Sequence, residues 1–145
     1  LIGLAITGGL VLYLLEQSTQ NVSGPVITVY KSPTCGCCQK WVDHLRDNGF
    51  KVKAVNRNDL PAIKAEHGIS ESIAACHTAL INGYVVEGHV PADSVRRLLR
   101  ERPAIKGIAV PGMPMGSPGM EGPAPQPYSI LTFDDTGTTG VYEVR

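Results

Sequence analysis

The cysteines are the residues of this chain whose types and spacing suggest chemistry. Three of them, Cys35, Cys37 and Cys38, lie in the stretch SPTCGCCQKW, and Cys35 and Cys38 form a C-x-x-C pair. Such a pair can exchange electrons as a disulfide, bind a metal ion or crosslink a small fold. The fourth cysteine, Cys76, is followed directly by His77. Because thiolates select soft ions such as Cu(I), and imidazole also binds copper and zinc, these five residues are candidate metal ligands.

The loop that carries the first three cysteines is expected to join a strand to a helix. The β-branched run at residues 26–30 predicts a short buried strand, and apolar residues recur at helical spacing in residues 37–48. Cys35 would then lie in the loop, with Cys37 and Cys38 in the first helical turn. Unpaired backbone N–H groups and the helix dipole stabilise negative charge there, so this position favours thiolates.

Further patterns predict the order β-α-β-α-β-β-α, followed by a long irregular segment and a C-terminal β-hairpin. A strand, then C-x-x-C, then a helix, in this order of elements, resembles a thioredoxin-like fold over residues 26–102, with three α/β/α layers. The pair Asn82-Gly83, between two apolar runs, is a strong hairpin-turn signal. The other predicted elements are a strand over residues 50–55, a helix over 58–68, a hairpin over 77–88, a helix over 91–102 and a hairpin over 128–144.

The pair Cys76 and His77 departs from the pattern of thioredoxin-like enzymes. Those enzymes carry a cis-proline at this place, facing the C-x-x-C, whereas this chain offers a thiol and an imidazole. The substitution weakens the case for a disulfide exchanger and favours a metal site. Two structural disulfides remain an alternative, because the number of cysteines is even. Adjacent helical residues point in different directions, so we do not expect Cys37 and Cys38 both to reach Cys35, and one could pair with Cys76.

All three methionines lie in the Pro- and Gly-rich segment at residues 103–127. A thioether is a soft ligand suited to Cu(I), and it cannot be lost into a disulfide, so Met113 and Met115 are also candidate ligands. The alternative is that the methionines fill an irregular gap over the cysteine loop, as flexible side chains do. Three other histidines are not expected to bind metal: His44 and His67, with solvated side chains on predicted helices, and His89, after the predicted hairpin.

The N-terminal stretch predicts export. Its first 15 residues, LIGLAITGGLVLYLL, are apolar or small and carry no charge. A run of this length is typical of a signal-peptide core, while a bilayer-spanning helix usually needs about 20 residues. We expect a signal peptide or a hydrophobic membrane-anchor helix at residues 1–17, a linker at 18–25 and one domain at 26–145. Export would place that domain in the periplasm, free or anchored to the inner membrane, where disulfides can form.

The charge pattern argues against one class of partner. The formal net charge is zero, with 13 basic and 13 acidic residues, and the chain has no long basic run. Proteins that bind nucleic acid usually present a basic patch to the phosphates. We therefore expect no nucleic-acid partner.

Four separated stretches together resemble one known family. YKSPTCGCCQKWVDHL, ACHTALINGYVVEGHVPA, GIAVPGMPMGSPGME and YSILTFDDTGTTGVY are similar to the exported bacterial family catalogued as domain-of-unknown-function family 411. The resemblance covers the chain from residue 26 onward. Members of that family are commonly labelled metal-binding proteins and are often associated with resistance to copper or other heavy metals. The resemblance implies the same for this chain, and its motifs include Cys35, Cys37, Cys38, Cys76, His77 and the loop methionines.

The sequence favours a periplasmic or membrane-tethered metal-binding protein that acts as a Cu(I) chaperone or sequestration module, with Zn(II) as the alternative ion. No enzymatic turnover is needed for this role. The expected partners are the metal ion, an exported copper protein or efflux component, and the membrane through the N-terminal segment. The first alternative is a thiol–disulfide oxidoreductase in which Cys35 attacks and Cys38 resolves. The second is an interaction module crosslinked by disulfides. The candidate metal ligands are Cys35, Cys37, Cys38, Cys76, His77, Met113 and Met115.

Overall fold

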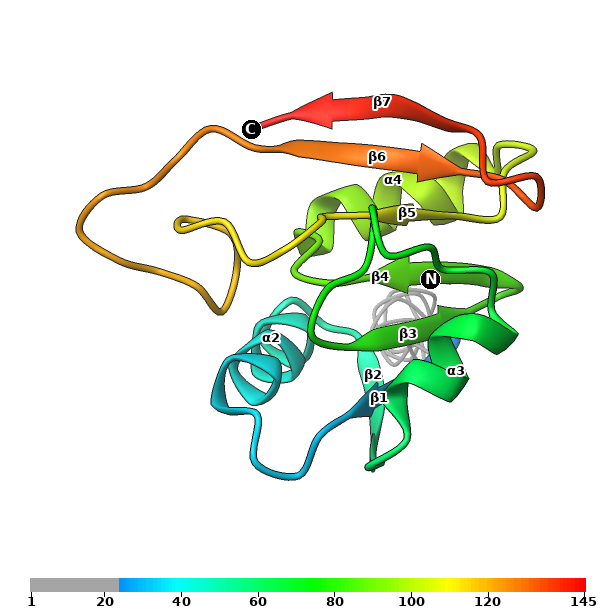
Figure 1. Ribbon diagram of the computed structural model, residues 1–145. Helices are drawn as coiled ribbons and strands as arrows, with labels where there is room; N and C mark the ends of the chain where they lie inside the picture. The colour runs from blue at the N-terminus through cyan, green and yellow to red at the C-terminus, as the bar shows by residue number, and fades with distance from the viewer. Residues whose placement is uncertain (1–23) are drawn as a thin grey trace, which may run out of the picture.

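The computed structural model describes residues 24–145, which form a mixed α/β fold with a seven-stranded sheet and three helices (Figure 1). The predicted N-terminal helix or signal peptide and most of the linker lie outside these residues. No helix in the described part of the chain is long and apolar enough to cross a membrane. In chain order the elements are β1 (Val26–Lys31), α2 (Gly36–Asp47), β2 (Lys51–Asn56), α3 (Leu60–Glu66), β3 (Thr78–Ile81), β4 (Tyr84–Glu87), α4 (Ala92–Glu101), β5 (Gly107–Ala109), β6 (Ser129–Phe133) and β7 (Thr139–Val144).

The strands lie in the order β2-β1-β3-β4-β5-β6-β7. The pairs β1/β2 and β4/β5 are parallel, and the other neighbours are antiparallel. The predicted order β-α-β-α-β-β-α and the C-terminal hairpin are confirmed. Asn82 and Gly83 form the turn between β3 and β4, both with positive φ, as a two-residue hairpin of this kind requires. This turn fixes the register of β3 and β4, and with it the residues that meet at the far end of the hairpin.

One element was not predicted: β5, inside the segment at residues 103–127 that was expected to be irregular. The strand has only three residues and begins with Gly107, which weakens any strand pattern. Glycine is needed there because a Cβ atom on Gly107 would lie 2.0 Å from the carbonyl oxygen of Val85 in β4. The strand joins the C-terminal hairpin to the rest of the sheet and starts the methionine loop, residues 110–127.

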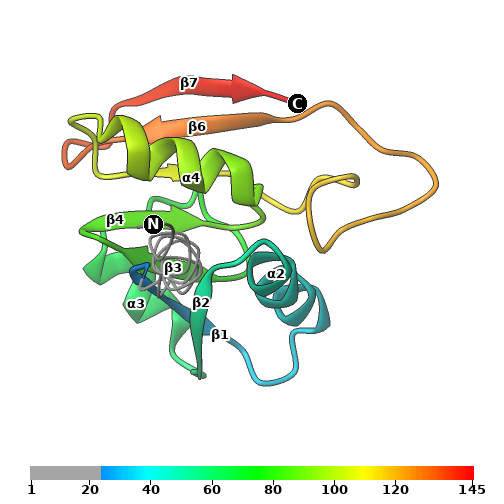
Figure 2. The same cartoon turned by 180° about the vertical axis from the view of Figure 1, so that it is seen from behind.

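The helices cover both faces of the sheet. Helices α2 and α4 lie on one face and α3 on the other, as the two opposite views show (Figures 1 and 2). The larger core lies under α2 and α4, and the buried indole of Trp41 there donates a 2.8 Å hydrogen bond to the carbonyl of Val90. A smaller core lies on the face of α3, around Ile73 and Phe133. The large core fixes the position of α2, and therefore of the cysteines at its start.

Candidate metal centre

The start of α2 brings three cysteines together. Cys35 is the N-cap residue, and its sulfur accepts a hydrogen bond from the backbone N–H of Cys38. Cys35 and Cys38 form a disulfide with their Cα atoms 5.3 Å apart. The free thiol of Cys37 lies 3.4 Å from the Cys35 sulfur. The expectation that Cys37 and Cys38 do not both reach Cys35 is therefore wrong, because an N-cap side chain sits over the helix end, where two successive residues can approach it.

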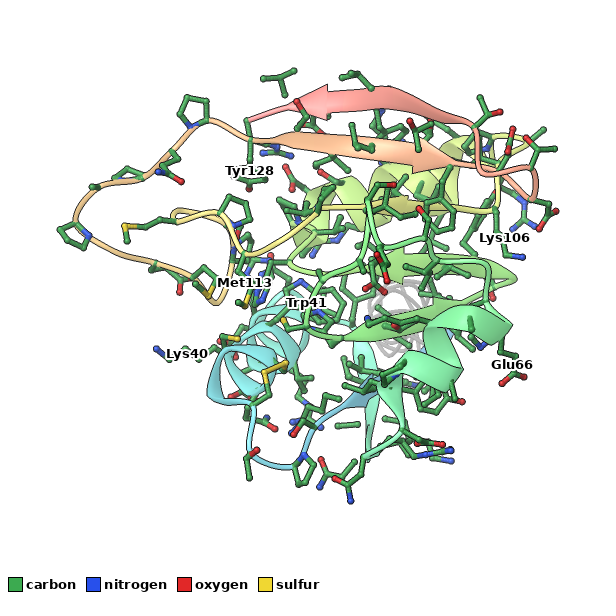
Figure 3. All side chains as sticks on the ribbon, viewed as in Figure 1. Lys40, Trp41, Glu66, Lys106, Met113 and Tyr128 are labelled. Atoms are coloured by element: carbon green, nitrogen blue, oxygen red, sulfur yellow. A yellow bond between two sulfur atoms is a disulfide. The ribbon has the colours of Figure 1, made fainter. Side chains whose placement is uncertain are left out.

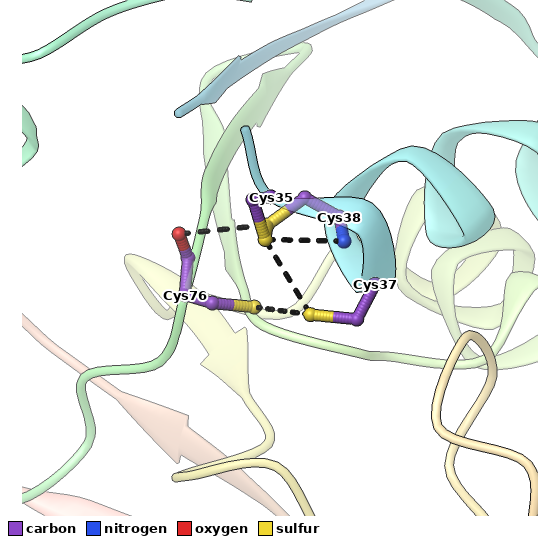
Figure 4. Close-up of side chains that lie close together, drawn as sticks. All are labelled: Cys35, Cys37, Cys38 and Cys76. Atoms are coloured by element: carbon purple, nitrogen blue, oxygen red, sulfur yellow. Dashed lines mark hydrogen bonds between the residues drawn. A yellow bond between two sulfur atoms is a disulfide. The ribbon is translucent and has the colours of Figure 1, made fainter. Parts of the chain in front are cut away.

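Cys76 reaches this group from a distant part of the chain. It lies in the segment before β3, and its thiol sulfur is 4.0 Å from that of Cys37 (Figure 4). The sulfur atoms of Cys35, Cys37, Cys38 and Cys76 all lie within 4.8 Å of one another. The four cysteines therefore form one sulfur cluster at the N-terminal end of α2.

Two imidazoles adjoin the same sulfur. His77 Nδ1 lies 3.3 Å from the Cys76 sulfur, and His89 Nε2 lies 3.0 Å from it. The rings of the two histidines meet edge to face, with centroids 4.9 Å apart, and His77 packs on Trp41. His89 was not expected to be a ligand, yet it lies in the second group of atoms that could hold a metal, with Cys76 and His77.

Backbone carbonyls fix which nitrogen of each imidazole carries the proton. His77 Nε2 lies 2.9 Å from the carbonyl of Gly88, and His89 Nδ1 lies 2.7 Å from that of Pro118. A carbonyl only accepts hydrogen bonds, so these two nitrogens must donate. The lone pairs of His77 Nδ1 and His89 Nε2 therefore face the Cys76 sulfur. Histidine ligands of metals are commonly oriented by such a hydrogen bond on the opposite nitrogen.

Burial sets the protonation of the centre before any metal binds. Burial lowers the pKa of both imidazoles, and that of His77 falls well below its ordinary value, with His89 as a further cause. Burial, followed by the nearby Cys37, raises the pKa of the Cys76 thiol to about 12. Near neutral pH the two imidazoles are therefore neutral and can donate lone pairs. Cys76 carries a proton that a metal ion must displace.

Because His77 is neutral in the folded protein, the free energy of unfolding should depend on pH. Because the pKa of His77 is lowered from 6.5 on folding, the unfolded chain gains a proton below this pH while the folded chain does not. The free energy of unfolding should then fall with decreasing pH, by about 1.4 kcal/mol per pH unit for this one group. We expect His77→Gln to lose this part of the slope. Urea unfolding of both proteins between about pH 5 and 6.5 measures it, and equal slopes would contradict a buried neutral His77.

The methionine loop extends from β5 toward the N-terminal end of α2 (Figure 3). Met113 Sδ lies 3.9 Å from the Cys37 sulfur, and the residue is 51% exposed. Met115 packs within its own loop, where a Cβ on Gly122 would lie 2.8 Å from its sulfur. Of the two methionines predicted as ligands, the structure thus brings Met113 to the cysteines and places Met115 against Gly122.

The two remaining histidines lie away from the sulfur cluster. His44 is half-buried in α2, and its Nε2 accepts a 3.1 Å hydrogen bond from the backbone N–H of Ala92, at the start of α4. It therefore binds the first backbone N–H of α4 and is not the solvated side chain that the pattern predicted. His67 is the C-cap residue of α3 and is partly exposed.

Two comparisons identify relatives of this chain. The family described as "Protein of unknown function, DUF411" matches residues 73–120. Two solved structures of copper resistance protein CopG, forms 2 and 1, are each 42% identical to the chain, with TM-scores of 0.80 and 0.79. Each alignment covers 84% of this chain and 98% of the CopG chain. The chain belongs to the DUF411 family.

The DUF411 membership predicted from the sequence motifs is therefore confirmed. The DUF411 match includes Cys76, His77, His89 and Met113, which are the residues that approach the cysteine loop from other parts of the fold. No curated protein sequence matches the chain.

Proposed function

We propose that this DUF411 protein binds Cu(I), as a chaperone or sequestration module, at a centre built around Cys76. The observation that carries the proposal is the convergence of two imidazole lone pairs and the thiol of Cys37 on the Cys76 sulfur. Thiolate and thioether sulfur are the ligands that Cu(I) prefers. The copper resistance proteins that are 42% identical to the chain support the choice of metal.

The ligand set depends on the redox state of the C-x-x-C pair. While Cys35 and Cys38 form a disulfide, their sulfurs are weak donors, and Cu(I) would use the remaining residues of the centre. Reduction of the disulfide would add two thiolates to the same cluster. The proposed ligands in the oxidised protein are Cys37, Cys76, His77, His89 and Met113. Zn(II) is the alternative ion, since a site with four sulfur and nitrogen ligands also suits its tetrahedral preference.

The proposal extends to the fold family and the cellular location. The order β2-β1-β3-β4, with β1/β2 parallel and the other two pairs antiparallel, supports a thioredoxin-like domain at residues 26–145. We place this domain in the periplasm, exported or anchored to the inner membrane by residues 1–17, because that stretch is apolar and uncharged. An exported copper protein or efflux component would exchange Cu(I) at Met113, the exposed sulfur of the centre.

Competitive titration of Cu(I) against a strong chelator tests the proposal, with the protein reduced beforehand. We expect His89→Gln to lower the Cu(I) affinity by about 10-fold or more, because losing a ligand should cost at least as much as losing the group that orients it. His67→Gln is the matched control, because His67 is the C-cap residue of α3, away from the sulfur cluster, and this variant should bind as the wild type does. A wild-type protein that competes no better than a variant in which all four cysteines are replaced with serine would overturn the proposal.

One observation favours a second function, that of a thiol–disulfide oxidoreductase. Cys35 and Cys38 already form a disulfide at a helix N-terminus, and the reduced pair could pass two electrons and two protons to a substrate disulfide. Reduction of insulin separates the two functions. Under the copper proposal we expect turnover at the background rate of free thiols. Robust turnover that Cys35→Ser abolishes would favour the oxidoreductase instead.

A further inference from the structure

A fully buried carboxylate, Glu87, lies beneath the segment that carries Cys76 and His77. It is the last residue of β4, and its side chain is 0% exposed. Its Oε1 accepts a 2.7 Å hydrogen bond from the backbone N–H of Ala75, and its Oε2 accepts one of 2.7 Å from the hydroxyl of Thr78. The two oxygens thus bind the residue before Cys76 and the residue after His77.

A lysine on α3, the helix that covers this face of the sheet, completes the arrangement. Lys64, in α3, lies 2.5 Å from Glu87 Oε1 and 3.1 Å from the hydroxyl of Thr78, and its side chain is 14% exposed. The hydroxyl of Thr78 can therefore accept from the ammonium group and donate to the carboxylate. The carboxylate, the ammonium group and the hydroxyl in this network each have hydrogen-bond partners. The network holds Ala75 and Thr78, the residues on either side of the proposed ligands Cys76 and His77.

Stability alone does not account for a buried ion pair. Burial raises the pKa of the Glu87 carboxyl, which reflects the cost of removing its charge from water, while Lys64 opposes that rise. Well-packed apolar residues of similar volume often give equal or greater stability than such a pair. What apolar residues cannot supply is the pair of directed hydrogen bonds to Ala75 and Thr78.

We infer that Glu87 is a positioning residue for the metal centre: its two hydrogen bonds form a clamp that holds Cys76 and His77 in the orientation that ligates metal. The inference rests on the proposed function. The segment before β3 needs such a support, because Ala75 bonds a side chain and not a neighbouring strand. On the far side of the clamp, the backbone N–H of Gly88 binds the carbonyl of His77 at 3.1 Å. Releasing the clamp would free Cys76 to turn away from the two imidazoles.

Two double variants separate the clamp from the ion pair. Glu87→Leu with Lys64→Met removes both the charges and the clamp, whereas Glu87→Gln with Lys64→Met removes the charges and keeps an acceptor for the Ala75 N–H. We expect the Leu/Met protein to bind Cu(I) about 10- to 100-fold more weakly than the wild type, as losses of outer-sphere support do. The Gln/Met protein should stay within about 3-fold of the wild type. Its amide group can still bond both Ala75 and Thr78.

Two further measurements exclude a general loss of structure. Urea unfolding should give the Leu/Met protein a stability equal to or above that of the Gln/Met protein, although its affinity is lower. Without metal, the amide hydrogen of Ala75 should exchange faster in the Leu/Met protein than in the other two. Two results would refute the clamp and leave the proposed function in place. In one, the Leu/Met protein binds Cu(I) with wild-type affinity; in the other, both variants lose the same affinity. Failure of the wild type to bind Cu(I) would overturn the proposed function, and with it the role of the clamp.

Discussion

Replacing Cys76 with serine is expected to lower the Cu(I) affinity of the reduced protein by at least about 100-fold, more than removal of any outer-sphere support. The Cys76 sulfur belongs to both groups of candidate ligand atoms, the four cysteines and the group with His77 and His89. Serine is nearly the same size, but its hydroxyl is a hard donor that Cu(I) binds poorly. Competition with a Cu(I) chelator measures the change directly.

The comparison with Cys37→Ser tests whether Cys76 is the centre of the site. Cys37 lies in the sulfur cluster but not in the group with the imidazoles, so its loss should cost less affinity than that of Cys76. If Cys76→Ser binds as the wild type does, Cu(I) is held by the C-x-x-C loop alone. In that case the two histidines have no part in binding.

Burial decreases along a line of donor atoms, which suggests how the metal reaches the site. His77 and His89 are both buried, Cys37 and Cys76 are partly exposed, and Met113 is exposed. The methionine and Cys37 sulfurs are 3.9 Å apart, and the Cys37 and Cys76 sulfurs are 4.0 Å apart. Under the proposed function, an ion could thus pass from one sulfur to the next without leaving the soft ligands. Transfer from the methionine side would also keep the buried imidazoles out of contact with water.

The sequence predicted the elements around the cysteine loop because hydrophobic patterning determines them. The β-branched run before Cys35 and the apolar face of the following helix both contribute to one large buried core, which includes Trp41. A strong pattern over 12 residues leaves little choice of structure for α2. The strand β5 was missed for the opposite reason, since three residues beginning with Gly107 carry no measurable pattern.

His89 was missed although the signal for it was present in the sequence. The Asn82-Gly83 turn sets a two-residue hairpin, in which Thr78 pairs with Glu87. Continuing that register by two residues on each strand places Cys76 opposite His89. Counting outward from the turn would thus have brought this imidazole to the cysteine. The residues next to His89 in the sequence do not show that it contacts Cys76, because strand pairing determines that contact.

Other features of the site lie beyond sequence patterns. The choice of Met113 over Met115 depends on the path of the methionine loop, which turns at Gly112, Gly116 and Gly119, each with positive φ. Composition predicts a loop there but not where each turn directs the chain. The C-x-x-C spacing likewise suits a disulfide or a metal equally well, so it does not decide between the two.

Gly119 is one of the points where the methionine loop contacts the site, and changing it to alanine is expected to weaken the support that the loop gives to His89. Gly119 has φ +90°, and a Cβ there would lie 2.8 Å from the carbonyl of Cys37 and 3.1 Å from His89 Nδ1. The loop would have to move away from α2, and the Pro118 carbonyl would then move away from His89. Without that acceptor, the His89 ring is free to turn its lone pair away from Cys76. We expect the Cu(I) affinity to fall by about 10- to 100-fold.

Gly116→Ala is a matched control for this effect, because it places the same strain in the same loop at a point away from the metal centre. Gly116 has φ +100°, and a Cβ there would lie 2.8 Å from Pro125, within the loop itself. Both variants should lose a similar part of their stability, since each forces a side chain into a backbone conformation that favours glycine. Only Gly119→Ala should also lose affinity and change the imidazole ¹⁵N shifts of His89. If the two variants bind Cu(I) equally well, the contact of the loop with α2 does not orient His89, and the Pro118 carbonyl is dispensable for the site.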